Sequence, residues 1–129
     1  MKVLPFLMFE GNCEEAMNFY VSLIPQSRII DIVRFGAGQA GKQGTVMRAT
    51  LNVGGQTVMC IDSAVKHAFT FTPSISFFVE CESQAQLDHI ASELGAGGNI
   101  LMPLGSYGFS RKFTWLNDRF GVSWQLNLA

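Results

Sequence analysis

The sequence predicts an α+β fold made of two βαβββ modules that pair to form a curved, partly open mixed sheet around a cavity. An apolar strand, an amphipathic helix and further strand-like runs occur in this order once in each half of the chain. Both helical segments carry apolar residues at the spacing of a helix with one buried face. These residues are Met17, Tyr20, Val21 and Ile24 in the first helix and Leu87, Ile90, Ala91 and Leu94 in the second. Because a duplicated module buries its apolar face against its twin, a pocket is expected where the two sheets curve together.

The first module spans about residues 1–64. Asn12, with Glu15 three residues later, is a capping-box start for its helix, and Pro25 ends that helix. Gly54-Gly55 indicates a hairpin turn. In chain order we expect strand Val3–Phe9, helix Cys13–Ile24, and strands Ser27–Phe35, Val46–Val53 and Gln56–Asp62. The apolar face of the third of these strands is expected to hold Met47, Ala49, Leu51 and Val53.

The second module spans about residues 70–129. Ser83 and Gln86 form its capping box, and Gly95 ends the helix. The expected elements are strand Ser74–Glu80, helix Gln84–Leu94, and strands Ile100–Leu104, Phe113–Asn117 and Val122–Leu128. Together the two modules are expected to make one domain over residues 1–129.

Composition limits the classes of partner. The chain is 48% apolar and only 15% charged, which leaves spare apolar surface and predicts a homodimer. Its net charge of −1 argues against nucleic acid or an anionic membrane as a partner, since both need a basic patch. No apolar run approaches the roughly 20 residues that cross a bilayer, and no export signal is expected. Three cysteines, Cys13, Cys60 and Cys81, read as reduced, buried thiols of a cytoplasmic protein.

Residues 36–41 match the GxGxxG dinucleotide fingerprint, and with Lys42 they nearly match a phosphate-binding loop. Both kinds of site require a helix that begins at the last glycines, so that its free N–H groups face the phosphate. The residues after this segment alternate in a strand pattern. We therefore interpret residues 36–44 as a loop between two strands that binds no nucleotide.

The two histidines, His67 and His89, lack the HxH, HxxxH or HExxH spacing that makes zinc binding credible. A surface or half-buried histidine on a helix is the simpler interpretation of His89, and His67 lies in the segment between the modules.

Four segments carry a resemblance to a known group of proteins: residues 11–20, 71–76, 102–110 and 118–126. The first, together with the twin βαβββ order, resembles the vicinal oxygen chelate superfamily of glyoxalase I, extradiol dioxygenases and fosfomycin- and bleomycin-resistance proteins. The other three resemble its PhnB-like branch, whose members often carry the label 3-demethylubiquinone-9 3-methyltransferase. The resemblance covers the whole chain and implies the glyoxalase fold.

In metal-dependent members of this superfamily, the first and last strand of each module supply the ligands of a divalent ion. Carried over, these slots fall at about Leu4 and Ser74 on the first strands and Met59 and Gln125 on the last. Leu and Met do not bind a hard or borderline cation, and Ser and Gln are weak neutral ligands. We therefore expect no metal and no other cofactor. The label implies methyl transfer, but no Gly-rich loop opens a helix to hold a methyl donor.

The predicted ligand-binding residues are Arg48, Ser74, Tyr107, Phe109 and Gln125. Gln125 occupies one of these metal-ligand positions, so the face of the last strand that it shares with Ser123 and Asn127 should line the pocket. Trp124, on the opposite face, should lie in the core. Arg48 would attract an anionic or carbonyl group. Two alternatives stay open for it, a solvent-exposed position or a partner for Asp62. Plain packing is the alternative for Tyr107 and Phe109.

The function predicted from these residues is metal-free binding of a small molecule by a homodimer. A lyase- or dioxygenase-type enzyme of the same fold is the first alternative, acting without metal or with a rearranged metal site at Asp62, Glu80 and His67. The second alternative is a non-catalytic structural or regulatory dimer. No residue set identifies a reaction, and no catalytic residue is predicted.

Overall fold

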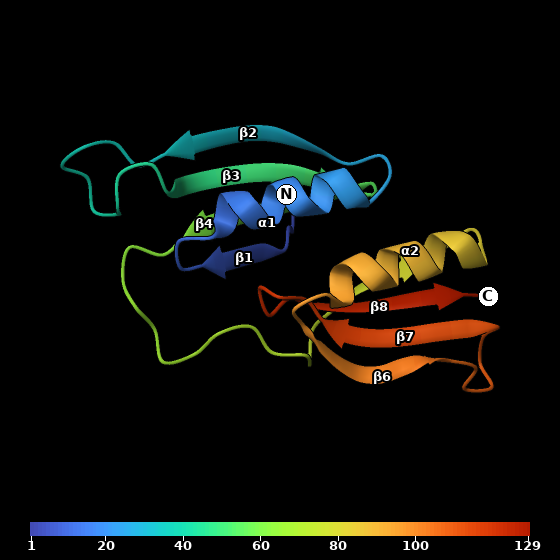
Figure 1. Ribbon diagram of the computed structural model, residues 1–129. Helices are drawn as coiled ribbons and strands as arrows, with labels where there is room; N and C mark the ends of the chain where they lie inside the picture. Colours follow the sequence, from blue (N-terminus) through green and yellow to red (C-terminus); the bar gives the residue numbers. More distant parts are fainter. The chain divides into compact units, whose positions relative to one another are not determined.

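A computed structural model describes residues 1–129 and shows two compact units, Met1–Ala68 and Phe69–Ala129. Each unit has the element order βαβββ, with one helix and its own four-stranded mixed sheet (Figure 1). The predicted α+β class and the repeated module order are therefore confirmed. Neither helix is long and apolar enough to span a membrane.

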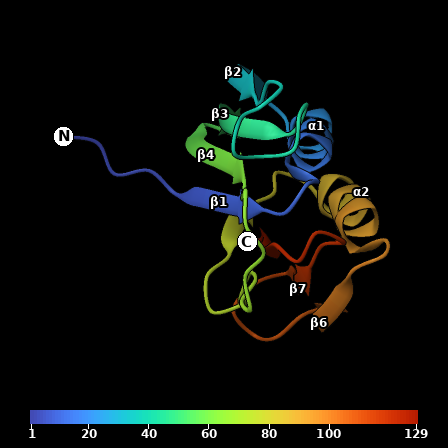
Figure 2. The same ribbon diagram turned by 90° about the vertical axis from the view of Figure 1, so that its left-hand side faces the viewer.

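The first unit contains β1 (Phe6–Phe9), α1 (Cys13–Leu23), β2 (Arg28–Arg34), β3 (Val46–Val53) and β4 (Gln56–Asp62). Its strand order is β1-β4-β3-β2, in which β1 runs parallel to β4 and the other pairs are antiparallel. Figure 2 shows α1 on one side of this sheet. The core between helix and sheet is formed by Ala16, Met17, Tyr20, Val46, Ala49, Leu51, Val58 and Cys60.

The start of α1 differs from the prediction. Asn12 makes no side-chain cap hydrogen bond, so the expected capping box is wrong there. Asp62, at the end of β4, caps the helix instead, since its Oδ1 accepts hydrogen bonds from the backbone N–H of Gly11 (2.7 Å) and Cys13 (3.1 Å). Its Oδ2 accepts a third from the N–H of Val46 (2.9 Å). A carboxylate from a distant strand thus ties the helix start to the sheet.

A β-bulge changes the apolar face of β3. Arg48 lies opposite Val33 but Val46 lies opposite Arg34, so Met47 is the extra residue on β3. Val46 is therefore fully buried while Met47 is only half-buried, which corrects the predicted face at this end of the strand. The 36–44 segment joins β2 to β3 without a helix, as predicted.

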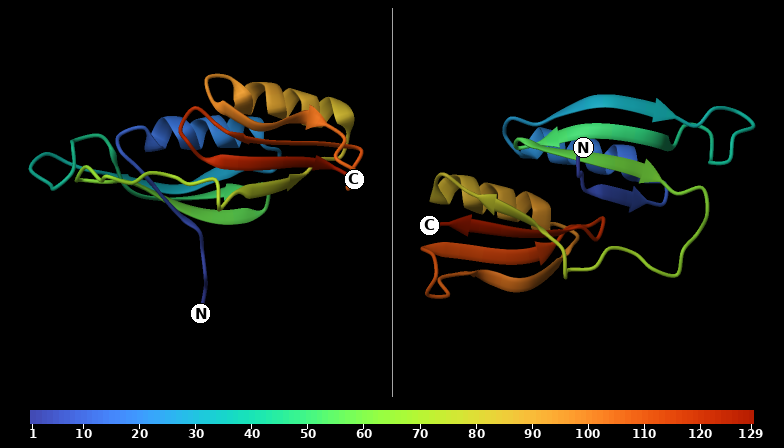
Figure 3. Two further views of the ribbon diagram at one scale, coloured as in Figure 1. Left: turned by 90° about the horizontal axis from the view of Figure 1, so that it is seen from below. Right: turned by 180° about the vertical axis from the view of Figure 1, so that it is seen from behind.

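The second unit contains β5 (Phe77–Glu80), α2 (Gln84–Gly95), β6 (Asn99–Gly105), β7 (Lys112–Asn117) and β8 (Ser123–Leu128). Its strand order β5-β8-β7-β6, with β5 parallel to β8, repeats that of the first unit. In Figure 3, α2 (gold) runs along one side of the orange and red strands. The core beneath it is formed by Leu87, Ile90, Leu94, Leu116, Trp124 and Leu126, which confirms the core position of Trp124.

Two polar side chains in this unit bond backbone N–H groups, one at the start of α2 and one in the turn before β8. The hydroxyl of Ser83 accepts a hydrogen bond from the backbone N–H of Gln86 (3.1 Å), as the predicted capping box requires. For the reciprocal bond, the side-chain oxygen of Gln86 accepts from the backbone N–H of Glu82 rather than from that of Ser83. Asp118 is buried in the turn before β8, where it accepts hydrogen bonds from two backbone N–H groups and from Trp124 Nε1 (2.9 Å).

All three cysteines are free and buried, as predicted. Cys13 and Cys60, far apart in the sequence, lie close enough for their side chains to form a hydrogen bond. That hydrogen bond, together with burial, raises the pKa of the Cys13 thiol well above its usual range. Burial also raises the pKa of Cys81, and the charge of Glu80 adds to this rise.

Candidate functional site

The second sheet has one face that does not pack against its own helix, here called the helix-free face. Strand register defines it, because cross-strand partners point to the same side of a sheet. Phe78, Gln125 and Trp115 form one row across β5, β8 and β7, and Glu80, Asn127 and Phe113 form the next. The alternate side chains, such as those of Trp124 and Leu126, are buried on the α2 side. The helix-free face therefore mixes polar and aromatic groups.

Two hydrogen bonds fix the middle of the helix-free face. The amide nitrogen of Gln125 donates to the hydroxyl of Ser76 (2.9 Å), and the indole nitrogen of Trp115 donates to the hydroxyl of Ser123 (2.9 Å). The bond to Ser76 holds the half-buried Gln125 side chain in one orientation. The side-chain carbonyl oxygen can then accept a hydrogen bond from a ligand.

A buried amide lies at the Glu80 end of this face. The side-chain nitrogen of Asn127 donates to Glu80 Oε1 (3.1 Å), which sets the orientation of the amide. Asn127 is only 8% exposed, and its Oδ1 is buried without a hydrogen-bond partner. Such an atom costs free energy and needs an explanation in a folded protein.

Four aromatic side chains, here called the aromatic cluster, gather beside this amide: Phe78, Tyr107, Phe109 and Phe113. The ring of Phe113 is buried. Its centroid lies 4.9 Å from that of Phe109 and 6.0 Å from that of Tyr107, both in edge-on arrangements, and 6.5 Å from that of Phe78. Phe78 and Phe109 remain 54% and 62% exposed. The hydroxyl of Tyr107 donates to the carbonyl of Pro103 (2.6 Å), which anchors the loop that carries Tyr107 and Phe109.

The corresponding helix-free face of the first sheet carries Arg48. Its side chain is exposed, and it lies opposite Val33. Asp62 does not pair with it, because that carboxylate is buried and binds three backbone N–H groups. Of the two alternatives for Arg48, the structure thus agrees with the solvent-exposed position. Arg48 as a ligand contact stays a prediction.

Ser74 lies in the turn before β5, where its hydroxyl and that of Thr72 are 2.9 Å apart. The two sheets repeat each other in register, with Phe6 opposite Met59 and Phe78 opposite Gln125. By this register the counterpart of Leu4 is Ser76, and Ser76 is the residue that bonds Gln125. Sequence reasoning missed Ser76, Trp115 and the paired roles of Glu80 and Asn127. The alternation of residues 122–128 already placed Asn127 on the face of Gln125.

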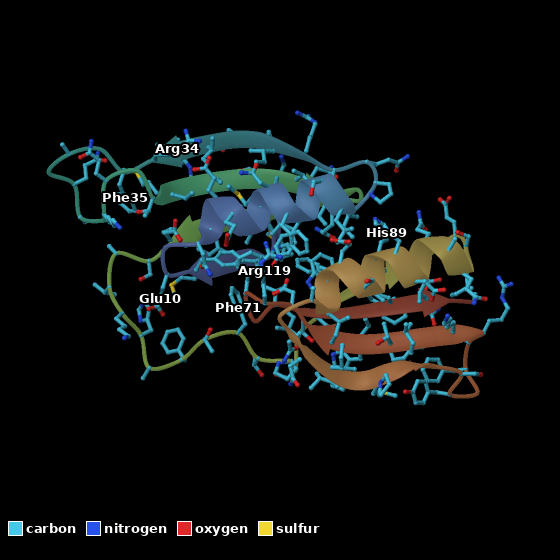
Figure 4. The ribbon with its side chains drawn as sticks, viewed as in Figure 1. Glu10, Arg34, Phe35, Phe71, His89 and Arg119 are labelled. Atoms are coloured by element: carbon cyan, nitrogen blue, oxygen red, sulfur yellow. The ribbon has the colours of Figure 1, made fainter.

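The residues present do not fit the divalent-ion site of the superfamily. Within either unit, no group of three or more His, Cys, Asp or Glu side chains could hold a metal ion. Asp62 and Glu80 are engaged as described, and His67 Nε2 is 2.9 Å from the Ser63 hydroxyl. His89 lies on the exposed side of α2 (Figure 4). Neither the apolar side chain of Leu4 nor the thioether of Met59 can act as a ligand of a hard cation.

The first unit also has an open hollow of about 240 Å³ next to the end of β4. Glu10 (labelled in Figure 4), Lys42 and Lys66 line it together with the oxygen-bearing side chains of Thr45 and Ser63. Its charges are of both signs, so the hollow favours neither an anionic nor a cationic ligand.

Comparison with known proteins identifies the group. The family described as 3-demethylubiquinone-9 3-methyltransferase matches residues 1–127. The chain belongs to this family. A solved family structure, described as a putative 3-demethylubiquinone-9 3-methyltransferase, PhnB protein, from Bacillus cereus, is 56% identical over 100% of both chains, with a TM-score of 0.97. The predicted PhnB-like branch is thereby confirmed.

Two further structures extend the comparison of this family member. Protein PA1353 from Pseudomonas aeruginosa is 28% identical, covers 99% of this chain and 97% of its own, and has a TM-score of 0.84. A glyoxylase/bleomycin resistance protein/dioxygenase domain from Frankia is 14% identical with a TM-score of 0.68, over 100% of this chain and 97% of its own. This last likeness shows the fold alone, which is the predicted one. Comparison with curated proteins finds no match.

Proposed function

We propose that this protein binds a small organic molecule on the helix-free face of the second sheet and uses no metal ion to do so. The observation that carries the proposal is the composition of that face. It holds a few oriented polar groups, Gln125 with Ser76 and Asn127 with Glu80, beside partly exposed aromatic rings. Small-molecule sites have this composition of apolar walls and a few fixed polar groups.

Each predicted ligand residue has a role in this proposal. Gln125 accepts or donates a hydrogen bond at the centre of the face, and the rings of Tyr107 and Phe109 cover an apolar part of the ligand. Ser74 offers a hydroxyl near the start of β5. Arg48 lies on the first sheet, outside this face, and stays a separate predicted contact for an acidic or carbonyl group.

The family's description names a methyltransferase acting on demethylubiquinone. We propose binding rather than methyl transfer, because the Gly-rich segment 36–44 connects two strands and presents no helix N-terminus to a methyl donor. The enzyme alternative with a metal at Asp62, Glu80 and His67 is not favoured by any observation, since each of these side chains already has another partner.

We also propose that the protein is a cytoplasmic homodimer. The helix-free side of the first sheet exposes the large apolar residues Phe6 and Val33, and free buried thiols suit a reducing compartment. Light scattering at micromolar concentration tests this assembly, and a monomeric mass would contradict it.

Thermal denaturation with a panel of ligands tests the binding proposal. Fosfomycin, bleomycin and a short-chain demethylubiquinone analogue are added in EDTA and, separately, with Mn²⁺ or Zn²⁺. At least one compound should raise the melting temperature in EDTA, because a ligand that binds only the folded state stabilises it. Gln125→Leu should abolish that rise, and Gln56→Leu, on the exposed hairpin of the first unit, should not. A rise that always requires added metal would refute metal-free binding.

A further inference from the structure

The Glu80 end of the helix-free face has acceptors without donors. Glu80, Asn127 and Phe113 are neighbours across β5, β8 and β7. The amide nitrogen of Asn127 is used by Glu80, so its Oδ1 is committed to accepting and has nothing to accept from. Because the amide cannot flip without losing the bond to Glu80, a ligand that fills this position must bring a hydrogen-bond donor.

The charge at this end of the face is negative and unpaired. The salt bridges of the structure join Arg34 to Glu14 and Lys112 to Asp88, and neither involves Glu80. Lys112 directly precedes Phe113 of the aromatic cluster in sequence, but its side chain turns to the α2 side, where Asp88 lies. Arg111 donates instead to the carbonyl oxygen of Ala129. These two neighbouring cations of the second unit thus do not pair with the Glu80 carboxylate.

Aromatic rings complete the surroundings. Phe113 is the cross-strand neighbour of Asn127, and Phe78 and Phe109 lie against Phe113 with much of their own surface exposed. The faces of such rings attract cations, most strongly where water is excluded. A carboxylate, an orphaned carbonyl oxygen and ring faces all favour a donor that carries positive charge.

We propose that this end of the face binds a protonated amine of the ligand. The ammonium group has three N–H donors, which suit Asn127 Oδ1 and Glu80, while the aromatic cluster contacts the carbon chain next to it. The proposal rests on the proposed function, because it names the chemical class of the ligand bound on that face. It adds Glu80 and Asn127 to the residues that determine ligand specificity.

A titration followed by ¹H–¹⁵N NMR tests this assignment with two matched probes. 2-Phenylethylamine is protonated at neutral pH, whereas 2-phenylethanol has the same ring and chain without the charge. The amine should shift the side-chain amide signals of Asn127 saturably and bind at least about tenfold more tightly than the alcohol. Glu80→Gln should remove this advantage, so that the amine and the alcohol bind with similar affinity. As a control, Glu82→Gln removes an exposed acid two residues further along the chain, and this variant should bind both probes as the unmodified protein does.

The outcomes separate this inference from the proposed function. Equal affinities for amine and alcohol, or equal effects of Glu80→Gln and Glu82→Gln, would overturn the amine site while leaving ligand binding on the face intact. Failure of both probes to saturate at about 20 mM would also overturn it. Increasing salt provides a second readout that needs no variant, because it should weaken the amine alone.

Discussion

Replacing Asp62 with Asn should strongly destabilise the first unit. The carboxylate is 2% exposed and accepts three backbone hydrogen bonds, from Gly11, Cys13 and Val46. An amide has only one oxygen, so one side of the new residue presents an NH₂ group to a backbone N–H. With the oxygen towards the helix the Val46 bond is lost, and in the other orientation both helix bonds are lost.

The magnitude follows from the better of these orientations. Losing one hydrogen bond to a charged group and leaving its N–H buried costs about 1.5–3 kcal/mol. The two remaining bonds lose their charge assistance, which weakens each by about half and brings the total to about 3–6 kcal/mol. This is a large part of the roughly 5–15 kcal/mol that stabilises a typical domain.

Urea denaturation followed by far-ultraviolet circular dichroism measures this loss. Both tryptophans lie in the second unit, so their fluorescence does not report on the first. Asp31→Asn, on the exposed side of β2, is the matched control and should change the free energy of unfolding by less than about 0.5 kcal/mol. A loss below about 1 kcal/mol for Asp62→Asn would refute the argument that its three bonds hold α1 to the sheet.

Three further outcomes are expected. Asp118→Asn should lower the free energy of unfolding by about 2–4 kcal/mol and change the fluorescence emission of Trp124, because the indole loses its hydrogen-bond partner. An unchanged midpoint of urea denaturation, followed by fluorescence, would contradict this. Cys81 should react slowly with a disulfide reagent at neutral pH, because burial and the nearby Glu80 raise the pKa of its thiol. Glu80→Gln should lower that pKa and speed the reaction. Equal reaction rates for the variant and the unmodified protein would argue against the electrostatic cause. Arg48→Met should change stability by less than about 0.5 kcal/mol in thermal denaturation, and a loss above about 1 kcal/mol would show that this side chain is structural.

The elements of the fold could be predicted because each has a local signal. The helices have apolar residues at helical spacing, the hairpin turn has Gly54-Gly55, and Ser83 caps the helix that follows it. The cap of α1 had no such signal, because the residue that caps it, Asp62, lies 49 residues after Cys13. The bulge at Met47 is not specified by the sequence either, because Val46 and Met47 are both apolar and the residue types do not say which of them faces the core.

The candidate site could be predicted only as far as single strands allow. Alternation in residues 122–128 identified the face that Gln125 and Asn127 share, and this needs no partner strand. Recognising Ser76 and Glu80 as their neighbours requires the register between β5 and β8, which are separated by two strands and a helix in the sequence. The orphaned oxygen of Asn127 depends on the orientation of one amide, which no residue pattern encodes.

The parallel pairing in each sheet also affects how the protein folds during synthesis. In both units the first strand pairs with the last one made, so β1 waits for β4 and β5 waits for β8. The first sheet has all its strands once residue 62 has left the ribosome, whereas the second needs residue 128. Domains formed early in translation fold while later ones are still emerging. The unit with Arg48 is therefore expected to fold on the ribosome first, and β1 and β5 each stay unpaired until the partner strand, β4 or β8, has been made.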